Sequence, residues 1–131
     1  MPQLTEFAKI SATLNFTPIG KVSAGFRLDV PFEGTATSEH WAGERPVSGV
    51  DRVTTGADGI QSLDITARIG TGKEVVSYRA IGRGTVDGGP RELFTFETAV
   101  EELGFLNHSI GCALGSIEKN KLELTVYLIE D

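Results

Sequence analysis

The sequence offers almost nothing from which a disulfide or a metal site could be built. Cys112 is the only cysteine among 131 residues, so an intramolecular disulfide and a cysteine-based zinc site are both excluded. The two histidines, His40 and His108, have no metal-ligand partner at a fixed local spacing. We therefore expect no metal and no other cofactor.

Basic residues are scarce and scattered. The chain has 12 Lys and Arg against 18 Asp and Glu, a net charge of -6, and no two basic residues are adjacent. Nucleic acids and anionic membrane surfaces are bound through clustered basic residues. We expect neither as a partner, and a large anionic substrate is disfavoured for the same reason.

Long apolar runs are absent too. No segment approaches the roughly 18 consecutive apolar residues of a membrane helix. Residues 1–10 lack the basic stretch and apolar block that mark a secretory signal. Together with the single thiol, these features predict a cytoplasmic protein.

What the sequence does contain is an alternation of apolar and polar residues with period two. It is clearest near the C-terminus, where Leu122, Leu124, Val126 and Leu128 alternate with more polar residues. The 16 glycines suit the turns and bulges that join strands. The pattern predicts strands over residues 4–16, 24–32, 47–54, 60–69, 74–81, 92–101, 105–116 and 122–128.

Two segments fit this pattern less well. Residues 33–46 have no period and are predicted to form a loop or lid, and residues 98–105 could alternatively form two turns of helix. Short antiparallel strands in succession indicate a sandwich or a barrel. Because closure removes exposed strand edges, we expect an all-β fold in which residues 1–131 form a single closed antiparallel up-and-down barrel of about eight strands.

A spaced motif runs through the second half of the chain. Phe96-Glu97-Thr98 is followed after seven residues by Leu106-Asn107, and then by Ile110 and Gly115. Earlier features fit the same pattern: Gly49-Val50-Asp51, Asp58-Gly59, Leu63-Asp64, and Tyr78 ahead of Gly82. From about residue 25 onward the chain resembles the bacterial domain-of-unknown-function family 3237. The resemblance implies a closed, lipocalin-like barrel and assigns no reaction. The chain departs from the family at Arg52 and Phe105, where many members carry Trp.

Three polar residues within or beside apolar strands are the first candidates for a site. Alternation and strand pairing predict that Glu97 lies near Asn107, and Asp51 lies in another strand. A carboxylate in an apolar interior has a raised pKa and can act as an acid or base near neutral pH. The alternative is that Glu97 faces water and that Asn107 satisfies a backbone group.

Aromatic and basic residues supply the other candidates. Tyr78 and Arg79 lie on opposite faces of one strand, so only one of them can face the interior. Tyr78 would provide a hydroxyl donor, whereas Arg79 would provide a cation for a carboxylate or enolate. His40 and Trp41, in the predicted loop, could touch a ligand at the barrel mouth, although Trp41 could instead plug one end.

These residues permit three functions. The first is a cofactor-free enzyme (isomerase, cyclase, lyase or hydrolase) that moves protons on a small apolar substrate inside the barrel. The second is a carrier for an apolar ligand, and the third is a structural or assembly module; a homo-oligomer is also compatible with the sequence. For the enzyme, the candidate catalytic residues are Glu97, Asp51, His40 and Tyr78, and the candidate substrate-binding residues are Asn107, Trp41, Arg79, Phe96 and Phe105.

Overall fold

The computed structural model describes residues 1–131 and consists almost entirely of strands. Its elements, in chain order, are β1 (Gln3–Leu14), β2 (Thr17–Val22), β3 (Gly25–Ser38), β4 (Trp41–Thr55), β5 (Ile60–Ile69), the 3₁₀ helix η1 (Gly72–Glu74), β6 (Val76–Thr85), β7 (Arg91–Thr98), the 3₁₀ helix η2 (Glu101–His108), β8 (Ile110–Glu118) and β9 (Lys121–Glu130). Neither helix has the length and apolarity needed to cross a bilayer.

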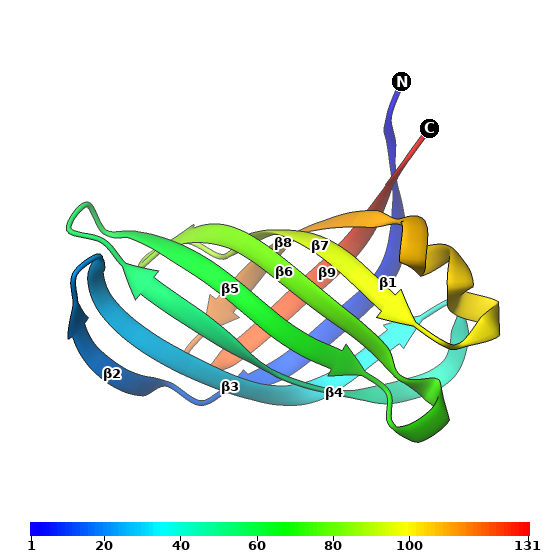
Figure 1. Cartoon of the computed structure of the whole chain (residues 1–131), viewed down its shortest axis with the longest axis horizontal. Helices are drawn as coiled ribbons and strands as arrows, with labels where there is room; N and C mark the ends of the chain where they lie inside the picture. The colour runs from blue at the N-terminus through cyan, green and yellow to red at the C-terminus, as the bar shows by residue number, and fades with distance from the viewer.

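All nine strands belong to one antiparallel sheet that closes on itself (Figure 1). The strand order is β1-β9-β8-β7-β6-β5-β4-β3-β2, and an additional pairing of β1 with β3 completes a barrel of eight strands. The ninth strand, β2, pairs only with the first half of β3. The predicted all-β barrel is therefore confirmed.

Strict alternation fills the barrel interior. In β9, Leu122, Leu124, Val126 and Leu128 are all buried, whereas the residues between them are exposed or half-buried. Period-two burial arises because successive side chains of a strand point to opposite faces of the sheet. The inward side chains of the eight barrel strands together form one apolar core.

One end of the barrel is closed by η2 and by aromatic side chains. Leu103 and Leu106 of η2 are buried, and the ring of Phe7 packs edge-on against Trp41 and Phe96. The two chain termini lie near this end (Figure 1). The opposite end carries β2 and the turns that join β4 to β5, β6 to β7 and β8 to β9.

Two local predictions were wrong. Residues 33–46 form no loop: they are the ends of β3 and β4, which pair up to Ser38 and Trp41 around a two-residue turn. Buried positions such as Ala36 do alternate there with exposed polar ones. The apolar–polar alternation cannot be recognised in the sequence, however, because several of the residues are small or charged. Phe105–His108 belong to η2 and to no strand, because Leu103 and Leu106, three residues apart, are buried as one helical face.

Candidate functional site

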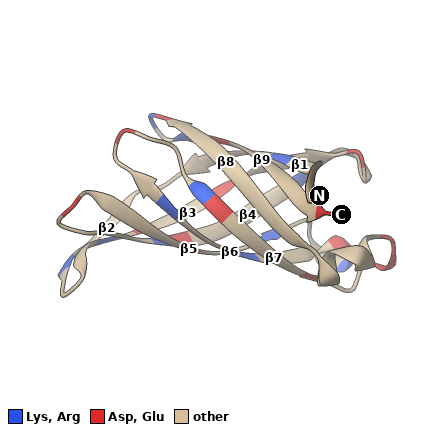
Figure 2. Cartoon of the chain, turned by 90° about the horizontal axis from the view of Figure 1, so that it is seen from above, with Lys and Arg blue, Asp and Glu red and all other residues tan.

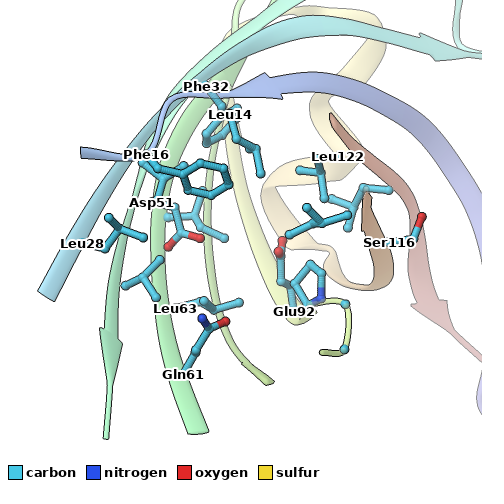
Figure 3. Close-up of a pocket in the computed structure, with 18 of the residues that line it drawn as sticks. Leu14, Phe16, Leu28, Phe32, Asp51, Gln61, Leu63, Glu92, Ser116 and Leu122 are labelled. Atoms are coloured by element: carbon cyan, nitrogen blue, oxygen red, sulfur yellow. The ribbon is translucent and has the colours of Figure 1, made fainter. Parts of the chain in front are cut away.

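A cavity of about 490 Å³ opens at the end of the barrel opposite η2. Thirteen of the 23 residues that line it are hydrophobic, and they come from most of the barrel strands. Its size falls within the range of ordinary small-molecule sites. Figure 3 shows the polar side chains of Asp51, Gln61 and Glu92 set among apolar ones such as Phe16, Phe32 and Leu122.

Asp51 lies in the wall formed by β4. It shares the inward face of this strand with Val47 and Val53, and the backbone N–H of Asp64 donates a hydrogen bond to its Oδ1 at 3.2 Å. Burial raises the pKa of Asp51 to about 7, and the nearby charge of Asp64 adds to the rise while the hydrogen bond opposes it. The carboxyl group is therefore close to half-ionised at neutral pH.

Glu92 is the only charged residue that is buried, with 7% of its surface exposed. It shares the inward face of β7 with Phe94 and Phe96, and no protein group donates a hydrogen bond to its carboxyl group. Burial, together with the charge of Asp51, raises its pKa to about 8. An unpaired buried carboxyl group is costly to keep as an anion, so Glu92 is mostly protonated at neutral pH.

Tyr78 supplies a phenol to the cavity. It faces inward from β6, is 3% exposed, and packs against the ring of Phe94 at a centroid distance of 5.1 Å. Burial, and then the charges of Glu92 and Asp51, raise its pKa well above the usual tyrosine range. The phenol therefore stays neutral and remains able to donate a hydrogen bond.

The cavity contains no interior cation. Lys119, the only lysine or arginine that lines it, lies in the turn between β8 and β9 at the open end. Asp51 and Glu92 therefore have no cationic partner, and the cavity disfavours anions. The ionisable groups inside the barrel are the carboxyl groups of Asp51 and Glu92 and the phenol of Tyr78, whereas Asp87 lies in the β6–β7 turn at the open end.

Several sequence predictions about orientation are wrong, and Glu97 is the most important. Inward positions on β7 are Glu92, Phe94 and Phe96, so Glu97 points outward and is exposed. Asn107 is also exposed, and its side chain hydrogen-bonds the backbone N–H and C=O of Thr98 at 2.8 and 3.0 Å. Asn107 therefore satisfies backbone groups, which was the alternative expected from the sequence. Its two hydrogen bonds hold η2 against the end of β7.

Four further candidates lie at the closed end, away from the cavity. The ring of His40 contacts the rings of Phe7 and Phe105 in a tilted arrangement, with centroid distances of 5.8 and 5.1 Å, and Trp41 is buried beside Phe7. Phe96 is part of the core, and neither it nor Phe105 lines the cavity. None of these four side chains therefore contacts a ligand in this cavity, because the β3–β4 turn and η2 lie at the opposite end. Trp41 instead helps to close that end, which was the alternative expected for it.

Tyr78 and Arg79 divide as their strand requires. Tyr78 faces the interior, while Arg79 faces outward and forms an ion pair with Asp64 at 3.6 Å. Arg79 therefore cannot hold a substrate in the cavity, whereas Asp51 and Tyr78 both line it. No three His, Cys, Asp or Glu side chains come close enough together to hold a metal ion.

Glu92 is the residue that sequence reasoning missed. Phe94 and Phe96 face inward, and Glu92 lies an even number of residues from both, so it shares their face of β7. Glu97 lies an odd number of residues away and is on the opposite face. The signal was therefore present in the alternation of β7. The spaced motif, by contrast, contains Glu97 and does not include Glu92.

Comparison with known proteins identifies the fold and nothing narrower. No family model and no curated protein matches the chain. A protein of unknown function from Clostridium acetobutylicum has a TM-score of 0.86 at 20% identity, with 98% of this chain and 99% of that chain aligned. A β-barrel-like protein from Acinetobacter baumannii has a TM-score of 0.87 at 18% identity, over 99% and 97%. An enzyme from Penicillium herquei has a TM-score of 0.71 at 20% identity, over 98% and 95%.

Proposed function

We propose that the protein catalyses proton transfer on a small, uncharged and largely apolar molecule bound in the barrel cavity. One observation carries the proposal: Asp51 and Glu92 present two carboxyl groups of raised pKa to the same apolar cavity. Paired acids and bases are most effective when their pKa values lie near the working pH. Two such groups in one cavity are more than a binding pocket for hydrocarbon requires.

The surroundings of the two carboxyl groups divide the roles. The hydrogen bond from the backbone N–H of Asp64 favours the anion of Asp51, whereas Glu92 is more deeply buried, accepts no hydrogen bond and has its pKa raised further by the charge of Asp51. Asp51 is then the general base and Glu92 the general acid. The Asp64 N–H bonded to Oδ1 of Asp51 holds that carboxylate in place and leaves Oδ2 free to accept a proton.

The chemistry follows from this arrangement. Asp51 removes a proton from carbon next to a carbonyl group, and the electron pair moves to form the C=C bond of an enol. Glu92 transfers its proton to the carbonyl oxygen, and the hydroxyl of Tyr78 donates a hydrogen bond to the same developing charge. With a β,γ-unsaturated ketone the enol is a conjugated dienol, so Asp51 can return its proton to the γ-carbon while the oxygen proton returns to Glu92. The carbon–carbon double bond has then moved into conjugation with the carbonyl group, and both carboxyl groups are restored.

The cavity also selects the substrate class. An anionic substrate would meet two carboxyl groups and no interior cation, whereas an uncharged ring system gains from the apolar wall. Phe16 and Phe32 provide flat apolar surface on this wall. We therefore favour an uncharged cyclic ketone or enone over a carboxylate or phosphate.

The comparisons are compatible with this proposal. The Penicillium herquei protein is an enzyme, so a barrel of this shape can support catalysis. Membership of domain-of-unknown-function family 3237 stays a prediction and would add no reaction. A carrier is the second candidate, favoured by the hydrophobic majority of the lining residues; it would need the cavity but would not need ionisable carboxyl groups.

Hydrogen exchange separates the two candidates. A panel of uncharged cyclic ketones and enones is incubated in D₂O with the protein, and deuterium uptake at carbon is followed by NMR. We expect uptake with the wild type, a loss of roughly 100-fold or more in Asp51→Asn and Glu92→Gln, and no change in Glu97→Gln, which alters an exposed carboxyl group of the same strand as Glu92. Uptake that is equal in all variants, or absent with every compound, contradicts the catalytic proposal.

A further inference from the structure

The outer wall of the barrel carries a cluster of exposed apolar side chains on three neighbouring strands. We define the outer patch as Ile81 on β6, Leu93 on β7, and Ile110, Cys112 and Leu114 on β8. Ile81, Leu93, Ile110 and Leu114 are 52%, 52%, 48% and 70% exposed. Single exposed apolar residues are normal on a protein surface, but a contiguous group calls for a partner.

Strand register makes the outer patch contiguous. Ile81 lies directly opposite Leu93, and Leu93 lies directly opposite Cys112, so one apolar row crosses three strands. Ile110 and Leu114 flank Cys112 on the same face of β8 because they are two residues away on either side. Figure 2 shows β8 uncharged along most of its length, and β7 uncharged between its two ends.

Charged residues border the outer patch with opposite signs at opposite ends. The outward positions of β7 read Arg91, Leu93, Thr95 and Glu97. Arg91 and Glu97 are exposed, and neither is in an ion pair within the chain. Arg79, also on this side, is already paired with Asp64.

We propose that the outer patch is the interface of a homodimer, in which a second copy of the chain packs face to face on β6, β7 and β8 about a two-fold axis. The two-fold axis lies in the plane of the interface, at right angles to β7 and level with the midpoint of its outward row. It places Arg91 of each copy opposite Glu97 of the other. Because the outward row of β7 begins with a positive charge and ends with a negative one, two copies of it that run in opposite directions are complementary in charge.

The size of the surface is suitable for such an interface. The four exposed aliphatic residues form the apolar centre of a surface that must bury about 800 Å² on each copy in a standard interface. Thr95, Arg91, Glu97 and Tyr127, which lies opposite Cys112, would extend it with the polar rim that interfaces carry. The interface lies on the side wall of the barrel, so the open end of the cavity stays accessible to ligand.

Sedimentation of the full chain over a wide concentration range tests the interface. We expect a dimer for the wild type and a monomer for Leu93→Glu and Leu114→Glu, with circular dichroism unchanged because both side chains are exposed. Ile60→Glu is the matched control, since Ile60 is 42% exposed on β5 outside the outer patch, and it should leave the dimer intact.

A charge exchange tests the orientation of the two copies. Arg91→Glu and Glu97→Arg should each weaken the dimer by about tenfold or more, and the double variant should return the dissociation constant to within about threefold of the wild type. A wild type that is monomeric throughout, or a dimer that survives both Leu→Glu substitutions, overturns the proposal. The two-fold arrangement is wrong if Leu93→Glu abolishes the dimer but the Arg91→Glu, Glu97→Arg double variant dimerises no more tightly than either single charge variant.

Discussion

Asp51 on β4 and Glu92 on β7 point into one cavity from strands that are separated in the sheet by β5 and β6 (Figure 3). Each is an inward position of a strand whose other inward residues are mostly apolar. The charge of Asp51 contributes to the raised pKa of Glu92. The titrations of the two carboxyl groups are therefore coupled: once Asp51 is ionised, Glu92 loses its proton only at a higher pH.

The first prediction concerns stability against pH. Both pKa values are higher in the folded state than the ordinary values of 3.8 for Asp and 4.5 for Glu, so the folded state binds protons that the unfolded state has released. Stability should then be highest below about pH 4 with respect to these groups and should fall as the pH rises to about 8. Asp51→Asn and Glu92→Gln should remove much of this fall.

Thermal denaturation at about pH 5 and about pH 9 measures the effect. The amide variants should melt above the wild type at the higher pH, by an amount corresponding to on the order of a few kcal/mol, and should lose most of this advantage at the lower pH. Glu97→Gln, an exposed control on β7, should follow the wild type. An identical pH response in wild type and Glu92→Gln would show that Glu92 is not held in its neutral form.

The second prediction concerns ligand charge. N-phenyl-1-naphthylamine, an uncharged fluorophore, should bind in the cavity and fluoresce more strongly than its sulfonated analogue, because the cavity has no interior cation. The preference should grow between about pH 6 and about pH 9 as Asp51 and Glu92 ionise. Fluorescence titration gives both dissociation constants. Equal affinities at both pH values would contradict the proposed charge selection.

The third prediction concerns the glycine beside Glu92. Gly82 pairs with Glu92 across β6 and β7, and an added Cβ would collide with the backbone carbonyl oxygen of Arg91 and lie 3.1 Å from Cγ of Glu92. Gly82→Ala should lower the free energy of unfolding by roughly 1–3 kcal/mol. At Gly84 a Cβ would meet only the end of the Gln61 side chain, at 3.2 Å. In urea denaturation, Gly84→Ala should lower the free energy of unfolding by less than Gly82→Ala does. A larger loss in Gly84→Ala would contradict the close approach of β6 and β7 at Gly82.

The fourth prediction concerns Tyr78. Because burial and the two carboxyl groups raise its pKa, its phenol should stay protonated as long as the barrel is folded. Alkaline titration by ultraviolet absorbance should therefore give the same phenolate signal for wild type and Tyr78→Phe up to the pH of unfolding. A smaller signal in Tyr78→Phe, with the fold intact, would mean that Tyr78 ionises in the native barrel.

The barrel itself could be predicted from the sequence because alternation reports directly on which residues face the core. The alternation of residues 60–69 and 122–128 corresponds closely to β5 and β9. The pattern fails where small and charged residues interrupt it, as in the β3–β4 hairpin that was expected to be a loop.

The site was predictable only in part. Asp51 and Tyr78 were among the candidates and line the cavity. Glu97 and Asn107 lie near each other as predicted, but they do so on the outer surface and not inside the barrel. A strand period defines two faces but does not by itself say which is inward, and in β7 the phenylalanines at 94 and 96 decide that Glu92 is the buried acid. Which end of the barrel is open depends on long-range contacts, such as those of Phe7 with Trp41 and Phe96, that no local pattern reports.

The most direct test of the account is a titration of the side-chain carboxyl carbons by ¹³C NMR, assigned with Asp51→Asn and Glu92→Gln. The account predicts that two of the 18 acidic side chains titrate with midpoints near 7 and 8, that these are Asp51 and Glu92, and that the midpoint of Glu92 falls when Asp51 is replaced by Asn. Midpoints near 4 for both residues would contradict the claim that one cavity holds a neutral acid and a base at physiological pH.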